Sequence, residues 1–262
     1  MTATWRFDDF TFDVLWEHVV GEELPAPLIY TSRTKDYLDY LREKREIAER
    51  LKAQWDRTFD RVVEVIKDPD LRLAVSGFDG RDPRRAEGCV RLLGLRRRDQ
   101  GFVIQQLPGE TYLHSGGFVV TECDPVRLAD AVSQLLPEHE PGRLGNVELT
   151  DVGGDTSVDR EYGRSVVGDN LGDSANLRRK RFLETPISCV GTIDVVQGSS
   201  KFGPRGITQF QLRWCDLEDD GRYVIGGEPP FVAVSADAHR MTSMINARVA
   251  AVVQAIKEER GI

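Results

Sequence analysis

Hydrophobic residues recur along this chain at two spacings, one typical of helices and one typical of strands. Helical spacing runs from residue 36 to residue 66 and predicts one or two amphipathic helices, which end at Asp68 and Pro69. Ahead of them, FTFDVLWEHVV predicts a short strand entering a helix, and the compact apolar run APLIYT predicts a buried strand. Three alternating runs follow, and each predicts a further strand: LRLAVSGF, CVRLLGL and GFVIQQL.

A helix closes the first half of the chain, and the same order of elements then returns in the second half. After YLHSGGFVV the spacing becomes helical, with Asp124 suited to an N-cap and Pro125 to a first helical turn. Further strands are expected at residues 187–196, 206–215, 222–226 and 231–234. The last helix has one apolar face, formed by Met241, Ile245, Val249, Val252 and Ile256. The pattern predicts two copies of a strand-strand-strand-helix unit.

The segment between these two units, residues 138–180, is dense in Gly, Asp, Arg and Ser and lacks sustained periodicity. Such a composition indicates a surface connection or a partly disordered segment. A chain of 262 residues can form one large domain or two small ones. We expect a single domain, with an N-terminal half at residues 1–137 and a C-terminal half at residues 181–262.

The stretch CDLEDDGRYVIGG raises two alternatives, a calcium-binding loop and a tight turn. Asp216, Glu218 and Asp220 fit positions one, three and five of the helix-loop-helix calcium pattern. That pattern requires a bidentate carboxylate at position twelve, which is Gly227 here. An alternating run precedes the stretch, and the β-favouring residues Tyr223, Val224 and Ile225 follow its Asp-Gly pair. We therefore expect a hairpin turn between two strands and no metal site.

Charge and cysteine content narrow the classes of function. A net charge of −8 and a pI near 5.2 argue against general nucleic-acid binding, which depends on a basic surface. The acidic start and the lack of about 18 uninterrupted apolar residues predict a cytoplasmic protein without membrane insertion. Four widely spaced cysteines form no C-x-x-C pair and are expected to be unpaired thiols: Cys89, Cys123, Cys189 and Cys215.

Catalytic motifs are missing from the sequence, including the nucleophile elbow, the phosphate-binding loop, the zinc-protease helix and the dinucleotide fingerprint. The fragment that most resembles a catalytic site is HSGG at residues 114–117, where His and Ser precede two glycines. Adjacent strand residues point to opposite faces, so His114 and Ser115 are not expected to share a proton. Helix capping and the helix dipole account for three early carboxylates, Asp8, Asp9 and Asp13. We therefore expect no catalytic activity and no cofactor.

Two passages carry a resemblance to a known family: FTFDVLWEHVVGEELPAPLIY and GTIDVVQGSSKFGPRGITQFQLRWCDLEDDGRYVIGGEPPFVAVSADAHRMTSMINARVAAVV. In their order and extent they resemble the EspG family, cytoplasmic chaperones of actinobacterial type VII (ESX) secretion. The resemblance is weakest between residues 138 and 185. It implies an α+β fold with a quasi-twofold repeat, in which helices flank a central antiparallel sheet. It also implies a non-catalytic chaperone that binds the tip of a helical, PE-PPE-like secretion substrate.

For this chain we expect the substrate groove to lie along the strand at 206–215 and the loop before it. One sheet face would offer polar contacts from Gln209, Gln211 and Arg213, and the loop would offer an apolar contact from Phe202. Against this stands the simpler interpretation that the polar face is only solvated. An immunity or adaptor protein for another helical or toxin partner, and a hydrolase using His114, are the competing hypotheses. The sequence leaves a homodimer open and does not name the client.

Overall fold

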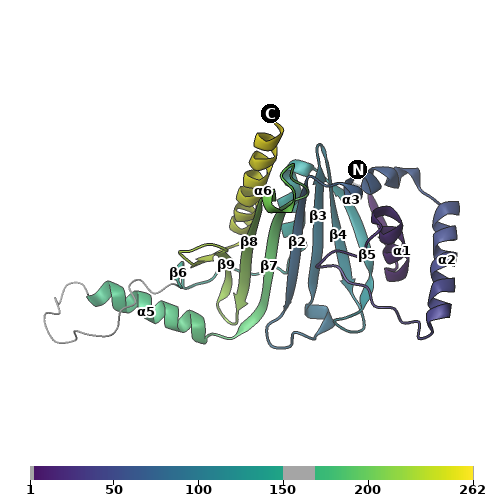
Figure 1. Ribbon diagram of the computed structural model, residues 1–262. Coiled ribbons are helices and arrows are strands. Elements are labelled where there is room, and N and C mark those ends of the chain that lie inside the picture. The colour runs from purple at the N-terminus through teal and green to yellow at the C-terminus, as the bar shows by residue number, and fades with distance from the viewer. Residues whose placement is uncertain (1–2, 150–168, 262) are drawn as a thin grey trace.

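The computed structural model describes residues 3–149 and 169–261, with the side chains of residues 169–173 excepted. One sheet of ten strands forms the centre of this part of the chain (Figure 1), and every strand pairing in it is antiparallel. The strands are β1 (Thr4–Phe7), β2 (Leu71–Asp79), β3 (Val90–Arg97), β4 (Gln100–Pro108), β5 (Ser115–Cys123), β6 (Val147–Glu148), β7 (Ile187–Gln197), β8 (Gln209–Leu217), β9 (Gly221–Gly226) and β10 (Val232–Ser235).

The strand order reads the same outward in both directions from the central pair of β2 and β7. One side continues through β3, β4, β5 and β1, and the other through β8, β9, β10 and β6. Each half places four consecutive strands ahead of a helix, one strand more than the predicted unit. An α+β fold with a central antiparallel sheet flanked by helices is thus confirmed, whereas the quasi-twofold repeat of one unit stays a prediction.

Six α-helices accompany the sheet in the described residues, and four of them form layers on its two faces. They are α1 (Asp9–Val20), α2 (Tyr37–Ala53), α3 (Asp60–Lys67), α4 (Leu128–Ser133), α5 (Asp169–Glu184) and α6 (Ala238–Arg260). Helices α4 and α6 pack on one face, over a core that β2, β7 and β8 share. Helices α1 and α3 cover the opposite face over β3, β4 and β5. A smaller core joins α5 to β8, β9 and β10 through Phe182 and Tyr223.

Local sequence signals explain where the helices begin and end. The Asp8 carboxylate accepts a hydrogen bond from the Thr11 amide at the start of α1, and Gly21 ends that helix at a φ of 81°. Positive φ angles are open to glycine because it lacks a Cβ atom. Asp237 caps α6 in the same way as Asp8 caps α1. The predicted apolar face of α6 is confirmed, since its five residues from Met241 to Ile256 are all buried.

Four sequence predictions need correction. FTFDVLWEHVV contains no strand, because residues 10–20 all lie in α1 and the strand β1 precedes them. APLIYT forms no strand: Leu28 is buried, but the Ile29 amide donates to the Gln106 side chain instead of a neighbouring backbone carbonyl. The strand expected at 206–215 lies at 209–217, because residues 204–206 form a short 3-10 turn. Helix α5 occupies positions assigned to the irregular linker, and residues 150–168 of that linker lie outside the described part. No described helix is long and apolar enough to cross a membrane.

Candidate partner-binding surface

The sheet has an open face, formed by outward side chains of β2, β7 and β8. Leu71, Leu73 and Val75 of β2 point into the core beneath α4 and α6, so the alternate residues of that strand point the other way. In Figure 1 no helix lies in front of β2 and β7. We define the open face by seven exposed or half-buried residues: Arg72, Ser76, Phe78, Thr192, Asp194, Gln211 and Arg213.

Hydrogen bonds order the polar side chains of the open face. Strand register places Asp194 opposite Gln211 and Thr192 opposite Arg213. The Gln211 amide nitrogen donates to Asp194 at 2.8 Å, and the Arg213 Nε donates to the Gln211 oxygen at 3.3 Å. Gln209 lies farther along the same side of β8 and is exposed. The three polar residues singled out in the sequence therefore do lie together on one face.

Phe202, the fourth candidate residue, lies apart from these three in the turn between β7 and β8. Its side chain is 69% exposed, with the Lys201 ammonium 5.1 Å from the centre of its ring. The Glu259 carboxylate accepts hydrogen bonds from the Ser200 hydroxyl (2.9 Å) and the Lys201 amide (3.2 Å). This turn is thereby tied to the end of α6, the helix that packs on the face opposite Arg213.

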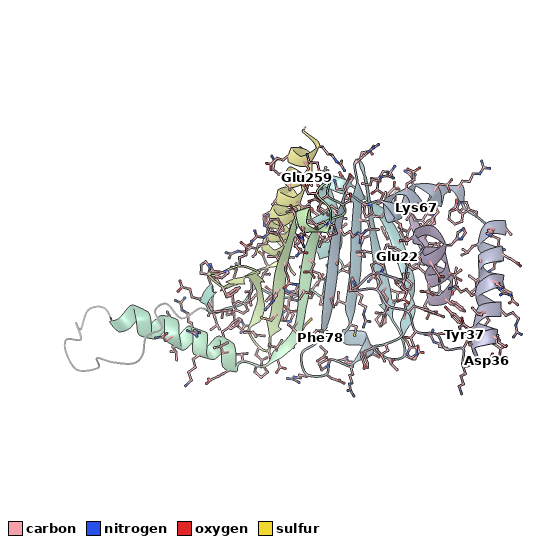
Figure 2. All side chains as sticks on the ribbon, viewed as in Figure 1. Glu22, Asp36, Tyr37, Lys67, Phe78 and Glu259 are labelled. Atoms are coloured by element: carbon pink, nitrogen blue, oxygen red, sulfur yellow. The ribbon has the colours of Figure 1, made fainter. Side chains whose placement is uncertain are left out.

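Exposed apolar side chains gather at one end of the open face, and the sequence analysis missed them. Phe78 is 39% exposed (Figure 2) and pairs in register with Val190. Ile187 is 38% exposed at the start of β7. Helix α5 leads directly into this end and exposes Leu177 and Leu183. Phe78 could have been found from the alternation in LRLAVSGF, which places it on the same side as Arg72 and Ser76.

Comparison with known proteins identifies the fold and the family. The family model that describes the EspG family matches residues 10–247. The chain belongs to the EspG family. One solved structure is the Mycobacterium tuberculosis type VII secretion system chaperone EspG5 in complex with a PE25-PPE41 dimer; it matches with a TM-score of 0.53 and 10% identity. That match covers 97% of this chain and 96% of the EspG5 chain, so the two share their fold over nearly their whole lengths. No curated protein sequence matches the chain.

In this member of the EspG family, three of the carboxylates at the end of β8 and in the turn to β9 are each bound to a different protein group. Asp216 is fully buried in a two-pronged ion pair with Arg222, at 2.6 and 2.7 Å. Asp220 accepts from the Tyr223 hydroxyl, and Glu218 pairs with Arg81. The predicted hairpin turn is confirmed by the pairing of Leu217 with Gly221. Among the described residues, no group of His, Cys, Asp or Glu side chains could hold a metal ion.

The residues of the HSGG fragment are engaged in separate local contacts. His114 Nδ1 lies 2.7 Å from the Thr111 hydroxyl. The Ser115 hydroxyl is buried and bonds to the backbone of Gly117. The side chains of His114 and Ser115 thus have different partners, as the strand geometry predicts. Burial also raises the pKa of two thiols to about 12, those of Cys123 and Cys215, which keeps them protonated and poorly nucleophilic near neutral pH.

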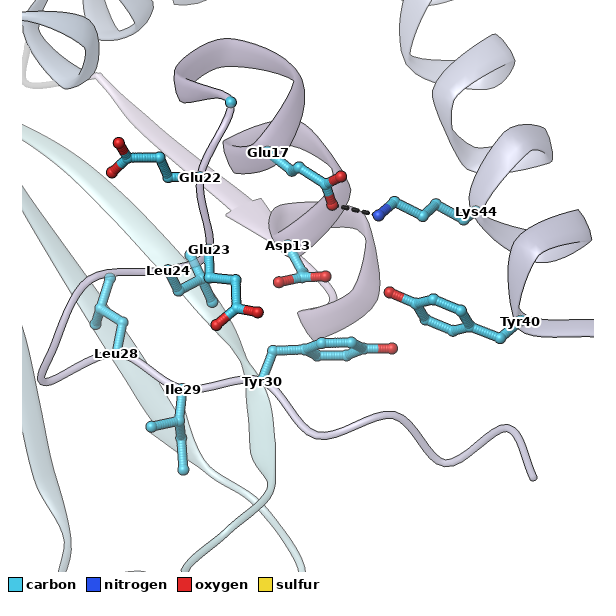
Figure 3. Close-up of a pocket in the computed structure, with 11 residues that line it drawn as sticks. Asp13, Glu17, Glu22, Glu23, Leu24, Leu28, Ile29, Tyr30, Tyr40 and Lys44 are labelled. Atoms are coloured by element: carbon cyan, nitrogen blue, oxygen red, sulfur yellow. Dashed lines mark hydrogen bonds and ion pairs between the residues drawn. The ribbon is translucent and has the colours of Figure 1, made fainter. Parts of the chain in front are cut away.

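An acidic cavity of about 610 Å³ lies between α1, α2 and the segment that joins them. Figure 3 shows Asp13, Glu17 and Glu23 around it, with Lys44 bound to Glu17 and the ring of Tyr40 beside Lys44. Burial raises the pKa of Asp13 to about 6, and the neighbouring carboxylates Glu17 and Glu23 add to that effect, while Lys44 opposes it. The lysine therefore neutralises only part of the negative charge.

Proposed function

We propose that the protein is a non-catalytic chaperone of type VII secretion. It binds the exposed tip of a helical, PE-PPE-like substrate in the cytoplasm and keeps that substrate soluble for export. Membership of the EspG family supports this proposal. The fold shared with EspG5, which forms a complex with a PE25-PPE41 dimer, also supports it.

The open face and its apolar end carry the proposal. A secreted helical dimer that exposes an apolar tip associates with itself unless that tip is covered. Phe78 and Ile187 supply exposed apolar area, and burying such side chains contributes roughly 25 cal/mol per Å². The neighbouring Gln211 and Arg213 can hydrogen-bond the polar ends of substrate helices, and they keep the face hydrated without a substrate. This combination suits a chaperone that must release its client.

Co-purification from the native host tests the function. A tagged chain is recovered from the cytosol and its partners are identified by mass spectrometry. We expect a small helical secretion substrate in near-stoichiometric amount. Recovery of the chain alone, or with a toxin or an unrelated enzyme, would contradict the chaperone function and favour the adaptor or hydrolase alternative.

Substitutions in the recovered complex then test the surface. Phe78→Asp and Arg213→Glu should each weaken substrate binding about tenfold or more, because Phe78 supplies apolar contact area and Arg213 a polar contact in the proposed interface. Phe202→Ala tests whether the turn between β7 and β8 takes part as well. Leu38→Ala is the matched control, since Leu38 is 73% exposed on α2, away from the open face. Binding unchanged in both open-face variants would show that the substrate lies elsewhere.

A further inference from the structure

A second, apolar pocket lies where α1, α2 and α3 meet, and it shares no residue with the open face. Its volume is about 360 Å³, at the lower end of the range of roughly 300–1,000 Å³ typical of ligand pockets. Val14 and Val19 of α1, Leu51 of α2 and Val63 of α3 line it. In Figure 1 these three helices lie at the end of the molecule away from α5.

The pocket stays open because the link between α2 and α3 holds Trp55 at its edge. The Trp55 indole nitrogen donates to the Asp60 carboxylate at 2.6 Å, and the ring packs edge-on against Phe59. The ring is 36% exposed, so part of it still faces water. Helix α2 buries only Ile47 completely and does not close over the pocket. The cavity therefore presents apolar surface to solvent in a fixed shape.

Two lysines stand at the rim of this pocket without an ion-pair partner in the described part of the chain. Lys52 and Lys67 line the pocket and are exposed. Two of the nearby carboxylates are engaged elsewhere: Asp60 binds Trp55, and Asp68 pairs with Arg97. Lys44, on the acidic side of the same helices, is by contrast bound to Glu17. In a protein of net charge −8, an apolar pocket with a cationic rim favours a partner that is apolar and acidic.

We propose that this pocket binds a short, acidic, amphipathic helix of a partner protein. One or two aliphatic side chains of that helix enter the space between Leu51, Val63 and Trp55. Its flanking carboxylates pair with Lys52 and Lys67. The mode is that of a helix laid into a groove of other helices. Because the pocket and the open face share no residue, this second partner does not depend on the chaperone function.

Two synthetic peptides test the proposal on the full chain. The first is a helical peptide of about 14 residues with leucines at positions i, i+3 and i+7 and glutamates beside them. The second replaces each glutamate by lysine. Fluorescence anisotropy should show the acidic peptide binding about tenfold or more tightly than the basic one, the effect expected of two surface ion pairs plus the removal of like-charge repulsion. Equal binding of the two peptides, or none, would overturn the proposal.

Charge reversal at the rim locates the binding. In the double variant Lys52→Glu/Lys67→Glu the preference should reverse, so that the basic peptide binds more tightly. Lys257→Glu, an exposed charge reversal on α6, should leave the preference unchanged. Circular dichroism checks that the variants are folded. Unchanged preference in the double variant would overturn the proposal. So would binding of dodecanoate at this rim without binding of the acidic peptide, which would identify an anionic lipid as the ligand.

Discussion

Asp13 shows how a single half-buried carboxylate can oppose stability. It faces the acidic cavity, where burial and the nearby Glu17 and Glu23 disfavour its charged form. Its pKa is about 6 in the folded chain, against an ordinary value of 3.8 for an aspartate carboxyl. The folded state therefore binds the proton more tightly than the unfolded state does. The protonated Asp13 thus stabilises the folded state relative to the charged form. That contribution to stability is fully present below about pH 4, the pKa in the unfolded chain, and is lost as the pH rises through the folded-state pKa of about 6.

Asp13→Asn should therefore raise the free energy of unfolding at pH 7.5. Asp13 remains partly exposed, and after discounting for solvent screening we expect a gain on the order of 1 kcal/mol. Urea unfolding at pH 4, 6 and 7.5 measures it, and the gain should shrink toward pH 4. Glu46→Gln, on the exposed side of α2, serves as the control for loss of one charge. A gain that is constant across the three pH values would contradict this account of Asp13.

At the scale of elements, close contact between the two central strands depends on a pair of glycines. Gly77 of β2 and Gly191 of β7 are opposite one another in the register, and both lie against the ring of Trp214. A Cβ atom on Gly191 would overlap that ring and the backbone oxygen of Ser76. Backbone atoms cannot move aside as a flexible side chain can. These glycines let the buried indole fit between the central strands and the helices above them.

Gly191→Ala should destabilise the fold by about 2 kcal/mol, in the range expected of overpacking in a well-packed core. Thermal unfolding with circular dichroism measures the loss. Gly226→Ala is the matched control on β9, because the nearest atom to its added Cβ is the Arg248 guanidinium at 3.8 Å. Equal effects of the two substitutions would indicate a general cost of replacing strand glycine and would remove the role assigned to Trp214.

At the scale of the whole molecule, one hydrophobic core joins the two halves of the chain. Leu71 and Leu73 of β2 and Leu128 of α4 belong to the first half, and they share this core with Ile193 and Met241 of the second. Neither half can expose its share of the core without exposing part of the other. The first half also has a core of its own beneath α1 and α3, but the shared core couples it to the second half more closely than independent domains are coupled.

The chain should accordingly unfold in one cooperative transition. Urea unfolding followed by tryptophan fluorescence and by far-ultraviolet circular dichroism should yield the same midpoint, as two-state behaviour requires. The tryptophans report mostly on the first half, which contains Trp5, Trp16 and Trp55, whereas circular dichroism averages over the chain. Two transitions, or midpoints that differ between the probes, would show that the halves are stable separately.

Sequence by itself determined the elements whose side chains have a regular period. Alternation located β2 and the first part of β8, because one face of each is buried and the other is less so. The β-favouring residues Tyr223, Val224 and Ile225 located β9. Helical spacing identified the buried face of α6, and Asp-Gly identified the turn. The grouping of Gln209, Gln211 and Arg213 followed from the same alternation. These features depend on residues close together in the chain.

Only the tertiary structure decided which surfaces are covered. Phe78 is of a residue type that is usually buried, but it is partly exposed. The helices α1 and α3 cover β3, β4 and β5, and no helix lies in front of Phe78 on β2. Phe202 is separated from Arg213 because Glu259, far along the chain, holds its turn against α6. APLIYT lacks a strand because a side chain, Gln106, takes the hydrogen bond of Ile29. Such outcomes depend on residues distant in sequence, and local periodicity carries no information about them.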